Sequence, residues 1–275
     1  MTVINYRKDL TEFERFYKEL EPQLSWESID SDIVRNWMEY MMDRGNSASS
    51  VNRRLSALRS FYRFALRRKL IEKDPVRGLQ GPKRQKPLPQ FLKESEMERL
   101  LDSKMWTDSY KDVLERTIII TFYVTGIRLS ELIGLDDKDI DNVTCEIKVT
   151  GKRNKQRIVP FGKEIADVFA QYQEVRNTTV KGDSIAFFQT EKGKRMTTAQ
   201  VRSLVKKNLS KVSTLKKRSP HVLRHTFATA MLNHEAGLES VKKLLGHESL
   251  STTEIYTHTT FEQLKKVYKN AHPRA

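Results

Sequence analysis

The chain of 275 residues contains one cysteine, Cys145, and this scarcity excludes a disulfide framework and any cysteine-rich metal site. No stretch approaches the ~18 consecutive apolar residues of a membrane span, and the first residues are no secretory signal. Acidic side chains are too few to balance the basic ones, so the formal net charge is +15. These absences predict a soluble, cytoplasmic protein without membrane contact that binds a polyanion.

The positive charge is gathered in two zones. Residues 51–86 carry a net charge of +10 and residues 151–225 a net charge of +13, whereas residues 1–50 carry −4 and residues 91–150 carry −5. A ribosomal or RNA-coating protein would more often be basic throughout. The alternation therefore favours a clamp, in which two basic surfaces grip one ligand.

The N-terminal third has the apolar periodicity of helices, predicted over residues 5–20, 31–43 and 47–70. The third helix is expected to bury a stripe of five apolar residues, Val51, Leu55, Leu58, Tyr62 and Leu66. A different face carries three arginines with almost no acidic partners, Arg59, Arg63 and Arg67, and Arg53 and Arg54 stand at its flank. Arginine offers a fork to phosphate, so this face predicts phosphate binding, with a solvated helix flank as the alternative.

Three prolines and a glycine within residues 81–90 predict a semi-rigid linker. We therefore expect two domains, an N-terminal helical clamp over residues 1–81 and a second domain over residues 91–275, joined by residues 82–90. The second domain opens with a helix over residues 91–101.

An almost wholly apolar helix is predicted before Gly126, which can end it, and Arg128 follows at its edge. A guanidinium beside so buried an element needs partners. Glu131, three residues on, supplies part of the compensation and is expected to support Arg128 structurally. An anionic ligand would supply the rest; the alternative is a purely structural ion pair.

Residues 146–161 read as two strands around a Gly-Lys-Arg-Asn-Lys turn, with a third short strand expected at 184–189 and a helix at 198–212. The turn presents Lys152, Arg153 and Lys155, which suits contact with DNA and delivery of Lys152 to a phosphate or a leaving oxygen. The predicted fold is mainly α with a small antiparallel β-sheet.

The stretch from Ser219 to Tyr256 gathers most of the candidate catalytic groups. Ser219 and Pro220 predict a helix start, after which His221, Arg224 and His225 share one face. A second helix over 238–245 is predicted to end at Gly246, which leaves His247 just past its cap.

Metal sites are disfavoured by the details of the motifs. The zinc-protease helix H-E-x-x-H would need glutamate where Val222 stands, and no third ligand has suitable spacing. The acidic run 136–142 fails the calcium-loop template, because Asn142 and Lys148 occupy its glycine and glutamate positions. We therefore expect no metal and no cofactor.

Two arginine forks stabilise the extra charge of a phosphodiester transition state without a metal ion. A tyrosine ionises only near pH 10, so Tyr256 would need a base or a cationic neighbourhood to react, and His221 and the arginines are the candidates. Lys152 in the turn suits delivery of a proton to a leaving oxygen.

The motifs TGIRLSEL, GKRNKQRIVP, HVLRHTFAT, LLGHESLSTTEIYTH and AHPRA together resemble the tyrosine recombinases of the phage integrase family, and most of all the bacterial Xer type. The resemblance implies a SAM-like core-binding domain followed by an α+β catalytic domain. It implies that Arg128 and Arg224 hold the scissile phosphate, Lys152 is the general acid, and Tyr256 the nucleophile. His221 and His247 become the acid/base and hydrogen-bonding pair, with His225 mainly structural.

The implied activity is site-specific recombination through a 3′-phosphotyrosine, as in resolution of chromosome or plasmid dimers, by an enzyme associated with the nucleoid. The implied partners are double-stranded DNA with short inverted-repeat sites, further copies or a paralogue in a tetramer, and a regulatory cell-division protein. A last helix after Thr259 has an apolar stripe that either enters a neighbouring subunit, as the resemblance implies, or packs on its own domain.

Alternatives within the enzyme class are a mobile-element integrase, disfavoured because the chain starts almost directly at the clamp, and a type IB topoisomerase, which would relax DNA without a specific partner site. Outside that class stands an architectural DNA-binding protein without catalysis. Occupation of all six expected catalytic positions argues against it.

Overall fold

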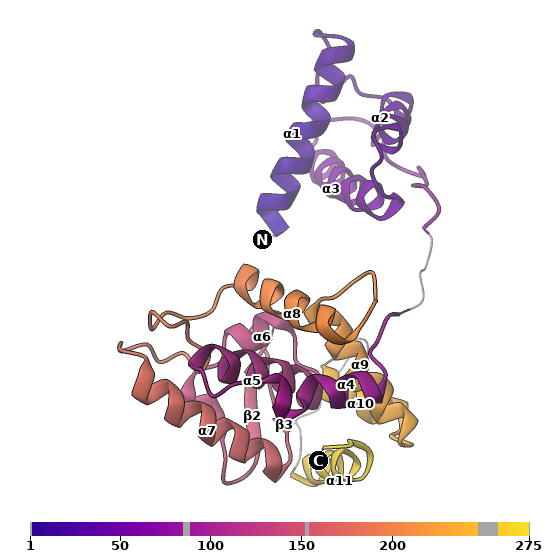
Figure 1. Ribbon diagram of the computed structural model, residues 1–275. Coiled ribbons are helices and arrows are strands. Elements are labelled where there is room, and N and C mark those ends of the chain that lie inside the picture. Colours follow the sequence, from indigo (N-terminus) through magenta and orange to yellow (C-terminus); the bar gives the residue numbers. More distant parts are fainter. Residues whose placement is uncertain (1, 85–88, 152–153, 247–257, 275) are drawn as a thin grey trace. The chain divides into compact units, whose positions relative to one another are not determined.

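The computed structural model describes residues 2–84, 89–151, 154–246 and 258–274. Contacts divide the chain into two compact units, Met1–Leu88 and Pro89–Ala275 (Figure 1). None of the helices in the described ranges is long and apolar enough to cross a membrane. Four of the predicted site residues lie outside the described residues, namely Lys152, Arg153, His247 and Tyr256.

The first unit is built from three helices, α1 (Thr2–Leu20), α2 (Ser31–Asp43) and α3 (Ala48–Arg67), as the periodicity predicts. Side-chain caps start two of them: Asp30 accepts from the backbone N–H groups of Asp32 and Ile33, and Ser47 accepts from that of Ser50. Aromatic side chains dominate the core between the helices, including Phe13, Tyr17, Trp37 and Tyr62.

The buried stripe of α3 differs from the prediction at one position. Val51, Leu55, Leu58 and Tyr62 are fully buried, but Leu66 is 39% exposed and Ala65 is buried in its place. An α-helix completes one turn in 3.6 residues, so buried positions alternate between spacings of four and three. After the spacing of four from Leu58 to Tyr62, the next buried position is three residues on, at Ala65.

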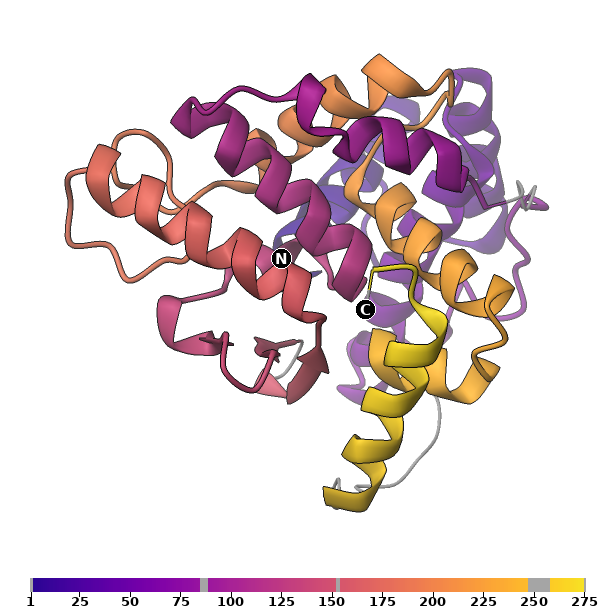
Figure 2. The same cartoon turned by 60° about the horizontal axis from the view of Figure 1, so that its bottom comes forward.

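The second unit surrounds α5 (Tyr110–Thr125), which lies between α7 (Lys163–Thr179) and α9 (Pro220–Asn233) (Figures 1 and 2). As expected, α5 is buried along nearly its whole length. Its threonine hydroxyls return hydrogen bonds to the carbonyl four residues earlier, 2.7 Å from Thr117 to Val113 and from Thr121 to Thr117. Polar side chains are therefore satisfied inside an apolar core.

The other helical elements of this unit are α4 (Glu94–Leu101), η1 (Ser103–Met105), α6 (Leu129–Ile133), η2 (Asp137–Asp139), α8 (Thr198–Val212), α10 (Leu238–Leu245) and α11 (His258–Ala271). The bounds of α8 and α10 agree with the sequence prediction. The elements predicted from the sequence include no helix at α7, although Ile165, Phe169 and Tyr172 are buried there at helical spacing.

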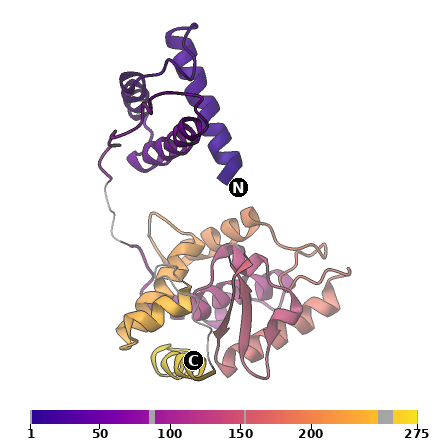
Figure 3. The ribbon, with the colours of Figure 1, turned by 180° about the vertical axis from the view of Figure 1, so that it is seen from behind.

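The sheet has three antiparallel strands in the order β1 (Ile140–Asp141), β2 (Glu146–Thr150) and β3 (Gln156–Pro160), visible from behind in Figure 3. The β2–β3 hairpin is where the sequence predicts it. The expected third strand at 184–189 is wrong: this segment makes only isolated bridges, Asp136 with Ala186 and Gln189 with Arg195. The two-residue β1 takes the third place in the sheet.

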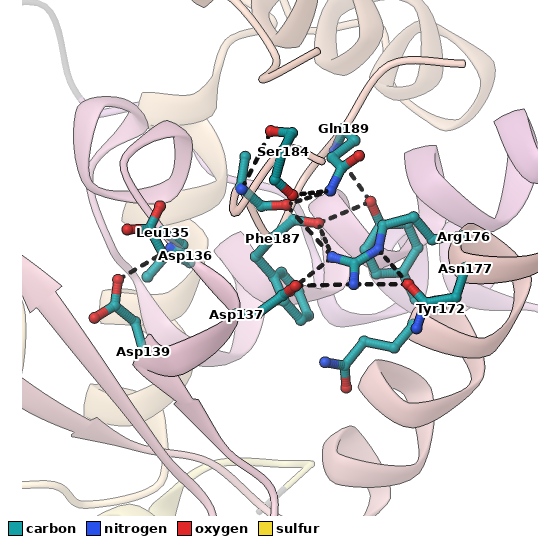
Figure 4. A network of polar contacts seen from close by, with 12 residues as sticks. Leu135, Asp136, Asp137, Asp139, Tyr172, Arg176, Asn177, Ser184, Phe187 and Gln189 are labelled. Atoms are coloured by element: carbon teal, nitrogen blue, oxygen red, sulfur yellow. Dashed lines mark hydrogen bonds and ion pairs between the residues drawn. The ribbon is translucent and has the colours of Figure 1, made fainter. Parts of the chain in front are cut away.

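Segment 184–189 is instead fastened to α7 by the guanidinium of Arg176 (Figure 4). Arg176 donates to both carboxylate oxygens of Asp137, at 2.6 and 3.0 Å, and to the carbonyl oxygen of Phe187 at 3.0 Å. The arginine side chain is only 6% exposed. The buried guanidinium of Arg176 thus adds to the few backbone hydrogen bonds of the segment, such as that from Phe187 N–H to Leu135 O at 2.9 Å.

Helix α11 packs on its own unit, beside α9 and α10 (Figure 2). Tyr268 and Ala271 are buried in a separate apolar cluster with Phe227, Met231 and Leu244. The predicted apolar stripe after Thr259 therefore has a docking place within the same chain.

Candidate active site

A glycine turn brings the end of α5 to the site. Gly126 has φ +58°, and a Cβ added there would lie 2.4 Å from Phe227 Cδ1 and 2.9 Å from Leu245 Cδ2. Both the left-handed backbone and the close approach require glycine. The ends of α5 and α10 therefore meet at the middle of α9, and Arg128 follows directly after the turn.

Arg128 combines an ion pair with partial exposure. Its Nη1 donates to Glu131 Oε1 at 2.8 Å, and its Nη2 donates to the carbonyl oxygen of Gly246 at 2.6 Å. Its backbone N–H also donates to Glu131 Oε2, at 2.7 Å. These contacts confirm the predicted pairing of Arg128 with Glu131. The side chain of Arg128 is still 39% exposed, so part of the guanidinium is accessible.

Arg224 is buried on α9 and is held by backbone carbonyls. Its Nη1 donates to Gly126 O at 2.6 Å and its Nη2 to Leu245 O at 2.7 Å. Burial, and then repulsion from Arg128, lower the pKa of Arg224 to about 10. The group therefore remains a cation at neutral pH.

Three successive carbonyls at the end of α10 each accept a hydrogen bond from a different arginine. Leu244 O accepts from Arg157 Nε at 3.1 Å, and the next two accept from Arg224 and Arg128. The last carbonyls of a helix have no partner within the helix and carry partial negative charge. The C-terminus of α10 therefore gathers the guanidinium groups of the site.

Glu131 is the carboxylate of this cluster, with its side chain 1% exposed. Burial raises its pKa, but hydrogen bonds and the charge of Arg157, followed by hydrogen bonds from Arg128, lower the pKa to about 2 overall. Glu131 is therefore charged at neutral pH. Sequence reasoning missed Arg157, whose only local signal is a cation directly before the apolar residues Ile158 and Val159 of the second hairpin strand.

His221 and His225 lie on exposed positions of α9, one turn apart. Desolvation, and then the neighbouring His225, Arg224 and Arg202, lower the pKa of His221. A lowered pKa keeps the imidazole of His221 neutral at pH 7, which is the form that accepts a proton.

The β2–β3 hairpin closes beside this cluster. Gly151 donates its N–H to Lys155 O at 2.7 Å, and a Cβ added at Gly151 would lie 3.4 Å from Glu131 Oε1. Lys155 itself has an exposed side chain. The turn that carries the predicted general acid therefore starts next to the buried carboxylate of the arginine cluster.

In the first unit, two of the predicted DNA-binding arginines have partners. Arg53 pairs with the buried carboxylate of Asp9, its Nη2 donating at 2.9 Å, and Arg59 donates to the carbonyl of Leu79. Arg63 and Arg67 are exposed, and neither makes a hydrogen bond or ion pair within the described residues. These two remain the most direct candidates for DNA contact.

The assembled cluster holds three guanidinium groups and one carboxylate, a net charge of +2. Arg128 and Arg224 point donors at backbone carbonyls from different helices and still have further N–H groups, because each guanidinium carries five. Such an arrangement can bind two non-bridging oxygens of one phosphate diester.

Comparison with known proteins decides the family. Residues 90–263 match the model of the phage integrase family, and residues 1–69 match the phage integrase N-terminal SAM-like domain. The chain belongs to the phage integrase family. It is 37% identical over 300 aligned residues to the tyrosine recombinase XerC of Chlorobaculum tepidum, a match that covers 100% of this chain and 89% of the relative.

Other members of the phage integrase family extend the likeness. The tyrosine recombinase XerD of Oceanobacillus iheyensis is 33% identical over 277 residues, covering 100% of this chain and 93% of the relative. Among solved structures, XerH site-specific recombinase bound to a palindromic difH substrate has a TM-score of 0.72 at 23% identity, covering 92% of this chain and 74% of that one. The predicted enzyme class, a tyrosine site-specific recombinase of Xer type, is confirmed.

Proposed function

We propose that this recombinase acts at short inverted-repeat sites on double-stranded DNA and resolves chromosome or plasmid dimers near the nucleoid. The observation that carries the proposal is the arginine cluster: Arg128 and Arg224, far apart in sequence, converge on the carbonyls of Leu245 and Gly246. A surplus of cations at this point suits a scissile phosphate.

In the proposed reaction Tyr256 Oη forms a bond to phosphorus while the bond from phosphorus to the 5′-oxygen breaks. His221 takes the tyrosine proton, and Lys152 gives a proton to the departing 5′-oxygen. Arg128 and Arg224 stabilise the charge on the non-bridging oxygens, and His247 adds a hydrogen bond. The 3′-phosphotyrosine retains the energy of the broken phosphodiester bond. A different 5′-hydroxyl can therefore attack the phosphorus, which forms a new phosphodiester and releases the tyrosine.

Strand exchange between two duplexes needs four active sites, so we propose a tetramer of this chain or of this chain with a paralogue, under the control of a cell-division protein. DNA would be gripped by Arg63 and Arg67 on α3, supported by Arg53 and Arg59, and by Arg153 and Lys155 at the hairpin. His225 would support the catalytic helix structurally.

Nicked or suicide DNA substrates that carry candidate recombination sites test the proposal. The wild-type protein and Tyr256→Phe are incubated with each substrate and separated on a denaturing gel. A covalent protein–DNA band with the wild type alone is expected. An equal band from Tyr256→Phe would refute the assignment of the nucleophile, and retardation without any covalent band would favour an architectural protein.

A further inference from the structure

Arg157 lies on β3, opposite Val149 of β2, and reaches two other elements. Its Nη1 donates to Glu131 Oε1 at 2.7 Å, its Nη2 to Glu131 Oε2 at 3.0 Å, and its Nε to Leu244 O at 3.1 Å. The side chain is 11% exposed. All three of its nitrogens are thus engaged, so this guanidinium is placed to orient other groups rather than to contact a ligand.

We propose that Arg157 is a positioning residue for the phosphate site: it binds both oxygens of Glu131 and neutralises that carboxylate, which leaves the charges of Arg128 and Arg224 available to DNA. The inference rests on the proposed role of those two arginines. It assigns to the hairpin a task separate from the one proposed for Lys152.

The charges of the cluster require such a group. Glu131 is needed to orient Arg128, since it accepts from both the side chain and the backbone N–H of that residue. Alone with Arg128, however, a buried carboxylate would cancel the charge that has to face the phosphate. Adding Arg157 restores a net charge of +1 to this trio, and Arg224 raises the total to +2.

The packing around Arg157 points the same way. A Cβ added at Gly246 would lie 3.1 Å from both Cζ and Nε of Arg157, so the glycine backbone lies against the guanidinium. The carbonyl of that same glycine accepts from Arg128 Nη2. Arg157 therefore binds one acceptor of Arg128, the carboxylate of Glu131, and packs against the residue that supplies the other, Gly246.

The test measures the single-turnover rate of covalent-complex formation on a nicked substrate at saturating DNA, for Arg157→Gln, Glu131→Gln and the double variant. Arg157→Gln should slow the reaction by about 10- to 100-fold, because a misplacement of about 1 Å in an active site can cost about 100-fold in rate. Glu131→Gln in the same chain should recover at least about tenfold, because an uncharged amide no longer cancels Arg128.

Arg176→Gln is the matched control, since it removes another buried arginine that pairs with a carboxylate away from the cluster. It should lower the melting temperature at least as much as Arg157→Gln and change the rate, measured below the melting transition, by less than about twofold. If Arg157→Gln does not fold, Arg157→Met with and without Glu131→Gln is compared by the same criterion.

A double variant no faster than Arg157→Gln would overturn the inference, as would an equal loss of rate in Arg176→Gln. In both cases the wild-type adduct still forms, so the proposed function stands. Absence of the adduct in the wild type would instead refute the proposed function, and the inference would fall with it.

Discussion

The imidazole of His272 is held as one neutral tautomer near the C-terminus. Its Nε2 donates to the carbonyl of Tyr123 at 3.2 Å, and its Nδ1 accepts from the backbone N–H of Arg274 at 3.1 Å. The ring is 5% exposed and stacks on Tyr268 and Phe227. A second proton would remove the Nδ1 acceptor and bury a charge, so protonation must loosen the tail.

Stability of the second unit should accordingly fall at mildly acidic pH. Burial lowers the pKa of His272 to about 4, from an ordinary value of about 6.5. Because the pKa of His272 is lower in the folded state, its contribution to the free energy of unfolding is complete above about pH 6.5. This contribution is lost as the pH falls towards 4. The shift corresponds to about 3 kcal/mol.

Unfolding free energies of the wild type and His272→Gln, measured between pH 7.5 and 4.5, check this expectation. The difference between the two proteins removes the titration of the other histidines. It should shrink steadily as the pH falls, and a constant difference would show that His272 does not titrate with folding.

Sequence reasoning at the residue scale succeeded where partners are close in the chain. Arg128 and Glu131 are three positions apart on a short helix, so their pairing is a local matter. Arg157 is 26 positions from Glu131 and 87 from Leu244, and only the folded hairpin and the end of α10 bring them together. Nothing in the periodicity of a strand reports such contacts.

At the scale of the element, some arginines of helix α3 are assigned to DNA binding and others stabilise the first unit. Arg63→Gln and Arg67→Gln should each weaken DNA binding and reduce the slope of log affinity against log salt by about 0.9, since each releases one phosphate contact. Neither makes a hydrogen bond or ion pair in the described part of the chain, so thermal stability should change little. Gel retardation at several salt concentrations measures both slopes.

Arg53→Gln is the matched comparison on the same helix. Asp9, which is 2% exposed, would lose its main partner, and the first unit should lose about 1–3 kcal/mol of stability. Arg53→Gln could instead reduce the slope of log affinity against log salt by about 0.9 and leave the melting temperature unchanged. That result would mean that Arg53 contacts DNA and does not stabilise the fold.

Elements with strong local signals were predicted well. The caps of α2 and α3 and the glycine after α10 fixed their ends. The segment 184–189 is not a strand, although its apolar run resembles a buried one. The carbonyls of Ala186 and Phe187 accept from the side chains of Arg176, Tyr172 and Gln189 (Figure 4), and other backbone groups pair with residues 135, 137 and 196. The four site residues outside the described ranges stay predictions of the sequence motifs.

At the scale of the whole molecule, each unit has its own apolar core, one around Trp37 and Tyr62 and one around α5. Residues 1–88 and 89–275 expressed separately should therefore each unfold cooperatively. Both carry basic residues that we assign to DNA, so the affinity of the whole chain depends on their covalent connection.

Covalent connection of two binding units gives the second binding event an effective concentration on the order of millimolar. The separate second unit should bind its DNA site at least about 100-fold more weakly than the full chain. Mixing the two units at about micromolar concentration should recover little of that loss, because this lies far below the effective concentration that the connection supplies. Retardation assays of the full chain, each unit and the mixture measure the difference. Full recovery on mixing would mean that the two units associate directly, without help from the linker.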